Sequence, residues 1–282
     1  MVIPLYDDNP FERTKLPLVT WGLIVVNVIV FIIELGTTGV DRIDSMSLAW
    51  GVVPADIMHA FEKNAPWRTW ATLVTATFVH AGWEHIIGNM IFLSVFGDDI
   101  ELALGRFRFL VFYLLVGVVA NLGYVVVNAN STTPLVGASG AISGVLAAYL
   151  MLRPCAYITA LVFVRIARIQ AFWVIGLWIA IQFYRIVTNE QDDVAYLAHL
   201  GGLVAGGALF ALMKPRDVTL FECIPQPGEE TPNEETAETA VSDKSAMEEY
   251  RWLRDLPAPS QARETRDKSR SAGPMRKPRN LR

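Results

Sequence analysis

Long apolar runs alternate with short polar segments along the first three quarters of the chain. Most of these runs reach about 20 residues, enough to cross the roughly 30 Å hydrocarbon core of a bilayer as a helix. One run is shorter, and small residues extend it at its start. The pattern predicts an all-α polytopic membrane protein with six spans, at about 18–36, 84–104, 107–127, 139–152, 170–188 and 195–213.

Composition agrees with this pattern, because 52% of the residues are hydrophobic and only 18% are charged. Such a chain is too apolar for an ordinary soluble domain of its length. The first apolar run follows a polar leader, residues 1–17, and is too long for the apolar region of a signal peptide. We therefore expect it to remain as a membrane anchor.

Basic residues in the short connecting segments predict the orientation of the spans. With six spans, all four basic groups fall on one side, and that side is predicted to be cytoplasmic together with both termini. Cys155 and Cys223 lie on the same side, where reducing conditions disfavour a disulfide, so we expect neither a bridge nor a metal there. The basic residues are Arg13, Lys15, Arg106, Arg108, Arg153, Arg165, Arg168, Lys214 and Arg216.

The remaining segments divide the chain into three parts, without an internal repeat. The spans form one domain over 18–213, and its long first loop, 37–83, interleaves aromatic and apolar residues. We expect that loop to pack on the outer leaflet. Residues 214–282 form a polar tail, acidic over 217–249 and basic over 250–282, whose composition predicts disorder and a cytoplasmic location.

Polar groups at membrane depth mark the candidate site. An ionisable side chain at the centre of a span costs about 2.5–3.5 kcal/mol, so each one is a functional hypothesis. Three of the four histidines, His80, His85 and His199, lie in or beside predicted spans. The fourth and sixth spans start from the same face, which places Ser139 and His199 at similar depth, about one helical turn below the surface.

Small residues spaced by four occur on both of these spans. Gly140, Gly144 and Ala148 form one stripe, and Ala198, Gly202 and Gly206 form the other. Such stripes let two helix backbones approach closely in lipid. The stripes predict that Ser139 lies within hydrogen-bond reach of His199, where a neutral imidazole could take the proton of the hydroxyl.

The stretch "HAGWEHIIGN" supplies a third element. His85 and Asn89 are four residues apart, so they share one face of the second span, and both can donate hydrogen bonds. The backbone N–H of Ser139 is a further donor, because it lies at the start of a helix. Together these groups predict an oxyanion hole for acyl transfer.

These motifs resemble those of the rhomboid family of intramembrane serine proteases. "GASG", from Gly137 to Gly140, resembles the nucleophile motif, "HAGWEHIIGN" resembles the His-x4-His-x3-Asn motif, and "AHLGGLVAG" resembles the Ala-His-x2-Gly-x3-Gly motif that ends at Gly206. Trp67-Arg68 is similar to a pair in the first loop of the family, and Glu101-x3-Gly105 to a helix end. The resemblance covers about residues 18–213.

The resemblance implies a six-helix core with a Ser-His dyad that cleaves the membrane segments of single-span proteins near the outer face. Ser139 would be the nucleophile and His199 the general base, with His85 and Asn89 as oxyanion donors and His80 in support. Gly137, Gly140, Gly202 and Gly206 would support the site, Trp67 and Arg68 would be interfacial anchors, and Glu101 a helix-end acceptor. One departure is Ser143, where some members place an aromatic ring against the imidazole.

The implied partners are membrane-protein substrates and the bilayer; we expect no cofactor, no metal and no nucleic acid. The compact loops favour a bacterial plasma membrane, with the active site open to the outer face. Two alternatives come from other classes: a non-catalytic rhomboid-like scaffold, and a metal-dependent hydrolase or transporter using His80, His85 and His199. The scaffold would be expected to lack the serine or the histidine, and the five-residue spacing of His80 and His85 does not place both on one helical face.

Overall fold

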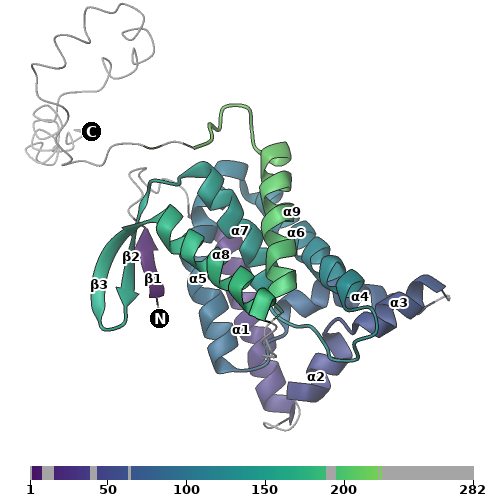
Figure 1. Ribbon diagram of the computed structural model, residues 1–282. Helices are drawn as coiled ribbons and strands as arrows, with labels where there is room; N and C mark the ends of the chain where they lie inside the picture. The colour runs from purple at the N-terminus through teal and green to yellow at the C-terminus, as the bar shows by residue number, and fades with distance from the viewer. Residues whose placement is uncertain are drawn as a thin grey trace, which may run out of the picture. The chain divides into compact units, whose positions relative to one another are not determined.

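The computed structural model describes residues 2–7, 16–38, 43–62, 65–188, 195–221 and 223. Within these ranges the chain is mostly helical and carries one small sheet, as Figure 1 shows. The tail predicted to be disordered lies almost wholly outside the described residues, so that prediction and the domain boundaries stay predictions. The elements are β1 (Val2–Asp7), α1 (Leu18–Thr38), α2 (Ile43–Trp50), α3 (Pro54–Glu62), α4 (Trp67–Thr75), the 3₁₀ turn η2 (Ala76–Phe78), α5 (Trp83–Leu104), α6 (Arg106–Val127), α7 (Ser139–Leu152), β2 (Tyr157–Val162), β3 (Arg165–Gln170), α8 (Ala171–Thr188) and α9 (Tyr196–Met213).

A long helix stands at each of the six predicted spans, with ends within about two residues of the expected ones. Among the described residues, α1, α6, α8 and α9 are long and apolar enough to cross a membrane, and α7 is apolar but shorter. Helix α5 is as long as α6 but carries four carboxylates, Glu84, Asp98, Asp99 and Glu101. The six predicted helices are therefore present, while the count of six membrane crossings stays a prediction.

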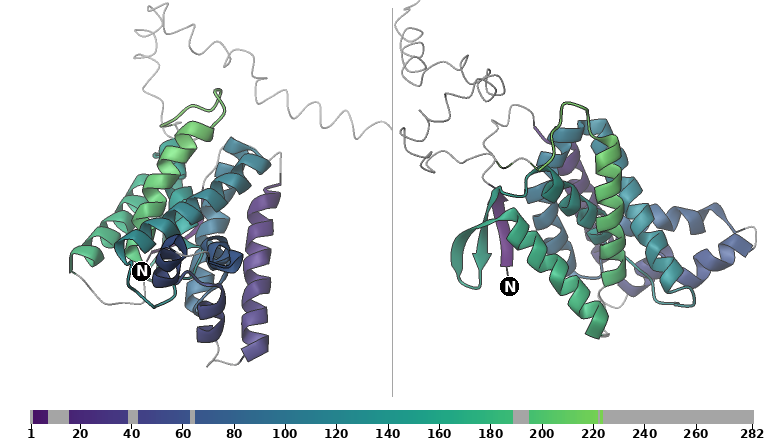
Figure 2. Two further views of the ribbon diagram at one scale, coloured as in Figure 1. Left: turned by 90° about the vertical axis from the view of Figure 1, so that its right-hand side faces the viewer. Right: turned by 45° about the horizontal axis from the view of Figure 1, so that its top comes forward.

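Helix α7 lies at the centre of the bundle, in contact with α5, α6 and α9. Its side chains are buried around most of its circumference, including the large Tyr149 and Leu146. Both views in Figure 2 agree with Figure 1 in placing α9 along α6 and α7. A short apolar helix can be buried in this way because its neighbours, rather than lipid, cover its faces.

A carboxylate near the C-terminal end of α5 caps the N-terminus of α1. The Glu101 carboxylate accepts hydrogen bonds from the backbone N–H groups of Val19 and Thr20, at 3.0 and 2.7 Å, and from the Thr20 hydroxyl at 2.8 Å. The N–H groups of a first helical turn have no partner within their own helix, and a negative charge there is favourable. Glu101 thus caps α1 from another helix, with Arg106 at 3.8 Å on its solvent side.

We expect Glu101→Gln to lower the free energy of unfolding by about 2 kcal/mol, the order expected for a lost hydrogen bond to a charged group. The amide nitrogen would face one of the N–H donors of α1. Urea unfolding in mild detergent measures this change, and Glu84→Gln, at an exposed position on the same helix, is the matched control. Equal unfolding midpoints for the two variants would contradict the capping role.

The predicted outer loop is folded into α2, α3, α4 and η2 rather than extended. Val52, Ile57, Leu73 and Ala76 form a small apolar cluster of their own, completed by Val125 near the end of α6. The Asn121 side chain on α6 donates to the carbonyl of Leu73 at 2.9 Å. This loop is therefore a packed helical layer fixed to α6.

A three-stranded antiparallel sheet, in the order β1-β2-β3, was not predicted. Residues of the expected leader form β1, and the expected loop between the fourth and fifth spans forms the hairpin of β2 and β3. The hairpin turns at Phe163, which has a positive φ of 53°. The search for apolar runs of membrane length averages over such short strands and therefore did not detect them.

The prediction of unbridged cysteines was wrong, because Cys155 and Cys223 are joined in a disulfide with Cα atoms 5.1 Å apart. The chain after α9 turns back toward the end of α7, where the N–H of Phe221 donates to the carbonyl of Met151 at 2.7 Å. That return brings the two cysteines together. The expectation had considered only the redox state of the compartment, and no local sequence pattern indicates this return.

Candidate functional site

Helices α7 and α9 meet backbone to backbone at their glycines. A Cβ atom placed on Gly202 would collide with the carbonyl of Gly140, and one placed on Gly206 would collide with the backbone of Gly144. The carbonyl of Ala198 lies 3.8 Å from the corresponding Cβ position of Gly140. Residue 139 precedes Gly140 and residue 199 follows Ala198. The contact therefore brings residues 139 and 199 to the same end of the crossing of α7 with α9.

Ser139 is the first residue of α7 and is half-buried. Its own carbonyl accepts a hydrogen bond from the Ser143 hydroxyl at 2.6 Å, one turn further along. The first-turn N–H groups of α7 have no partner within the helix and point toward its N-terminal end. Within the described part of the chain the Ser139 hydroxyl makes no hydrogen bond, so the predicted hydrogen bond to His199 is not formed in this structure. Catalytic hydrogen bonds are often long or poorly aligned before substrate binds.

His199 is buried, and its ring is held on two sides. Nδ1 lies 2.7 Å from the side-chain oxygen Oε1 of Gln182 on α8. The ring of Trp178, one turn earlier on α8, lies beside the imidazole with centroids 5.6 Å apart and planes tilted by 36°. Tyr196 approaches edge-on at 6.3 Å.

The predicted oxyanion donors come from the first turns of α5. Asn89 is buried, and within the described ranges its amide nitrogen has no hydrogen-bond partner. A buried N–H group without an acceptor costs free energy. Such a group is expected where an oxygen of a bound ligand supplies the missing acceptor. The His85 ring lies over Gly137, where a Cβ would be 2.6 Å from ring atoms of the histidine and where φ is +119°. Only glycine suits that position.

The outer loop holds the segment that leads into Ser139. Val52 and Leu135 exchange two backbone hydrogen bonds, at 2.9 and 2.8 Å, as an isolated bridge. The N–H of Gly137 donates to the carbonyl of Ala76 at 2.8 Å. The layer of α2 to α4 therefore fixes the backbone beside the serine.

His80 stands behind His85, with ring centroids 5.1 Å apart in an edge-to-face contact. Its Nδ1 donates to the carbonyl of Phe78 at 3.3 Å, and its backbone N–H donates to the Glu34 carboxylate at 3.5 Å. Burial, and to a lesser extent the neighbouring His85, lowers the pKa of His80 to about 3. The ring is therefore neutral at physiological pH and backs His85 without adding charge.

Three of the residues predicted in support are not brought to the site. Trp67 is 72% exposed at the start of α4, and the guanidinium of Arg68 lies over the Trp50 ring at 5.1 Å. Glu101 is about 18 Å along α5 from Asn89. These positions suit the anchoring and capping roles.

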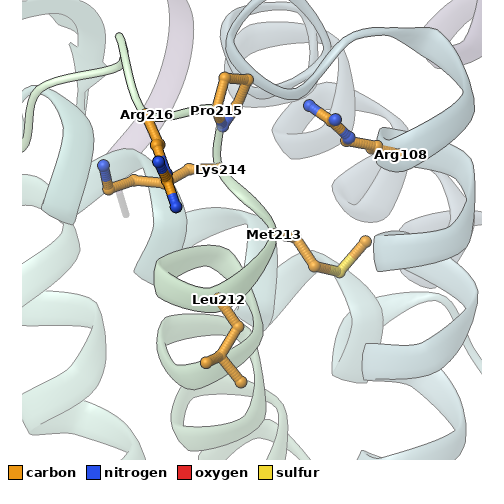
Figure 3. Close-up of a pocket in the computed structure, with 6 residues that line it drawn as sticks. All are labelled: Arg108, Leu212, Met213, Lys214, Pro215 and Arg216. Atoms are coloured by element: carbon orange, nitrogen blue, oxygen red, sulfur yellow. The ribbon is translucent and has the colours of Figure 1, made fainter.

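A cavity lined by cationic side chains lies at the other end of α9 and is also separate from the site. Arg108, Lys214 and Arg216 border it beside Met213 and Leu212, as Figure 3 shows. It is about 20 Å along the helix from His199. This cavity therefore takes no part in chemistry at Ser139.

The sequence reasoning missed Gln182 and Trp178. Gln182 is only 4% exposed, although its neighbours Ile181 and Phe183 on α8 are 43% and 54% exposed. An amide in an otherwise apolar run was a readable signal, since polar groups at membrane depth need partners. The histidines and the serine had been read as polar exceptions, but the glutamine had not.

The family model for the Rhomboid domain matches residues 66–216, which is more than half of the chain. The chain belongs to the rhomboid family. This membership, together with the apolar helices, makes it a multi-pass membrane protein with a polytopic helical fold, as the hydropathy pattern predicted.

Curated relatives match over part of their length. The chain is 36% identical to "Rhomboid-like protein 11, chloroplastic" of Arabidopsis thaliana over 119 residues, which are 42% of this chain and 40% of the relative. It is 38% identical to "Putative rhomboid protease YdcA" of Bacillus subtilis (strain 168) over 87 residues, 29% of this chain and 41% of the relative. With "Rhomboid-related protein 1" of Caenorhabditis elegans it shares 34% over 160 residues, 51% of this chain and 39% of the relative. The chain thus spans about two fifths of the length of these relatives.

Proposed function

We propose that this protein is an intramembrane serine endopeptidase in which Ser139 and His199 form a catalytic dyad. The observation that supports the proposal is the backbone contact of α7 with α9 at Gly140, Gly144, Gly202 and Gly206. Ser139 and His199 are sequence neighbours of residues at one end of this contact. The buried amide nitrogen of Asn89, which has no hydrogen-bond partner among the described residues, supports an oxyanion site beside them. Membership of the rhomboid family and the protease in the name of the relative from Bacillus subtilis agree with it.

The chemistry follows from the arrangement of donors and acceptors. Nε2 of His199 takes the proton from the Ser139 hydroxyl while Oγ bonds to the scissile carbonyl carbon. The negative oxygen that forms accepts hydrogen bonds from His85, Asn89 and the N–H of Ser139. The C–N bond then breaks as His199 returns the proton to the leaving amine, which leaves an acyl-enzyme. Water, with His199 again as base, releases the new carboxyl end.

The substrates we propose are single-span membrane proteins cut near the outer membrane face. The basic connecting segments support cytoplasmic termini and an active site that opens outward. We further propose a bacterial plasma membrane as the location. The relative from Arabidopsis thaliana is chloroplastic by name. The proposed location is therefore independent of the proposed catalytic mechanism.

The function is tested by reconstituting the purified protein in liposomes with a panel of single-span proteins that carry small residues near the outer boundary. We expect cleavage that persists in strong chelator. Loss of cleavage with chelator would favour the metal-dependent alternative. Specific binding of the panel without cleavage, by a folded protein, would favour the scaffold alternative.

Asn89→Ala should lower kcat by about 100- to 1,000-fold and leave KM nearly unchanged, because an oxyanion donor acts only in the transition state. Asn128→Ala is the matched control: its amide donates to the carbonyl of Tyr124 at 3.0 Å, beyond the end of α6. Steady-state rates on one liposome-bound substrate separate the two parameters. If Asn89→Ala raised KM alone, the amide would bind substrate without stabilising the oxyanion.

A further inference from the structure

Helix α8 lies beside the proposed dyad and contributes two side chains that the dyad itself does not include. Gln182 is buried against α9, and Trp178 lies one turn before it. The Gln182 amide is bonded at both ends: Nε2 donates to the Trp178 carbonyl at 3.1 Å, and Oε1 faces Nδ1 of His199 at 2.7 Å. Both partners lie within hydrogen-bonding distance, so the amide is a bridge between α8 and the imidazole.

The chemistry of these groups allows one orientation of the amide. A backbone carbonyl only accepts hydrogen bonds, so the nitrogen of Gln182 must face Trp178. With the amide turned around, two oxygens would face each other in a buried place, which is costly. Oε1 therefore faces His199, and because this oxygen only accepts, the proton of a neutral imidazole is held on Nδ1. Nε2 is left with its lone pair free.

We propose that Gln182 is a positioning residue that fixes the tautomer of His199, so that Nε2 is the nitrogen able to take the Ser139 proton. The inference rests on the proposed function and adds to it a neutral orienting partner in place of an acid. A neutral acceptor also stabilises the imidazolium that forms during attack, through a hydrogen bond to a charged donor. No buried carboxylate, with its desolvation cost, is needed.

Trp178 completes the same device. Ser143 on α7 has no ring to place against the imidazole and instead bonds to the carbonyl of Ser139. The indole of Trp178 covers the His199 ring from α8, and its backbone carbonyl anchors Gln182. Helix α8 thus restricts both the plane and the protonation of the base.

Three variants test the role of Gln182. Gln182→Met keeps length and apolar volume but removes the acceptor, and should lower kcat by about 10- to 100-fold with little change in KM, the range expected for one hydrogen bond to a charged group. Gln182→Glu, as the neutral acid, keeps an oxygen toward Nδ1 while its hydroxyl can donate to the Trp178 carbonyl, so it should recover most of that loss. Ile181→Met, at the neighbouring half-exposed position, is the matched control and should behave as the unmodified protein.

The direct readout is the ¹⁵N spectrum of histidine-labelled protein, which distinguishes Nδ1–H from Nε2–H imidazole. With four histidines in the chain, the His199 signals are assigned by their loss in His199→Ala. We expect one Nδ1–H tautomer in the unmodified protein and in Gln182→Glu, and a mixture in Gln182→Met. An unchanged tautomer and kcat in Gln182→Met would overturn the positioning role.

This experiment separates the two proposals. Suppose that the unmodified protein cleaves substrate and Ser139→Ala does not, while Gln182→Met keeps the tautomer and the rate of the unmodified protein. The positioning role alone then fails. If Ser139→Ala cleaves as fast as the unmodified protein, the proposed function fails. The spectrum then still reports whether Gln182 fixes the imidazole. Because the spectrum requires no substrate, the tautomer result does not depend on choosing the right one.

Discussion

Ser139→Ala in the reconstituted protein should reduce cleavage of a membrane substrate by at least about 10,000-fold, and His199→Ala should do the same. Without Oγ no acyl-enzyme forms, and without the imidazole the hydroxyl keeps its proton. The two substitutions remove parts of one unit, so the double variant should be no slower than either single one. Initial rates of product formation, followed on gels, measure all three.

Ser143→Ala is the matched control for the serine. Its hydroxyl donates its hydrogen bond to the carbonyl of Ser139, so we expect a rate within a few-fold of the unmodified one. Thermal unfolding of each variant shows that the fold is intact. A Ser139→Ala protein that cleaved at even a tenth of the unmodified rate would exclude Ser139 as nucleophile.

Gly202→Ala should lower cleavage by about 100-fold, although the residue touches neither substrate nor proton. Its new Cβ would overlap the carbonyl of Gly140, so α7 and α9 would have to separate. A displacement of about 1 Å between nucleophile and base is enough for a loss of this size. The same overlap should cost about 1–3 kcal/mol of stability.

Gly201→Ala, one residue away on the same helix, is the matched control. A Cβ there would meet only Ala120, at an ordinary contact distance of 3.6 Å. Both variants replace a glycine by alanine within α9, so the change in helix propensity is the same. Any difference between their cleavage rates therefore reports the close approach of α7 and α9. Equal rates for the two variants would show that the close approach of α7 and α9 does not set the site.

Much of the fold was predictable because a bilayer imposes simple lengths. Five long helices and the shorter α7 lie where the apolar runs predicted them. The stripes of small residues predicted the contact of α7 with α9, since glycines spaced by four have few other uses at membrane depth. The histidines and the serine were visible as polar exceptions in apolar runs.

The rest depended on contacts that no local pattern encodes. Glu101 caps α1 across about eighty residues of chain, and the Cys155–Cys223 bridge depends on how the chain returns after α9. The sheet pairs the first residues of the chain with a hairpin that begins at Tyr157. Gln182 was readable as a buried amide, but its partner was not, because register between α8 and α9 is set by packing.

The dyad itself is tested most directly by mass spectrometry of the protein treated with a fluorophosphonate, which forms a stable bond only with an activated serine. We expect one adduct, on the peptide that contains Ser139, and none in His199→Ala or after unfolding. An adduct on another serine, or cleavage of substrate by a protein fully modified at Ser139, would contradict the dyad.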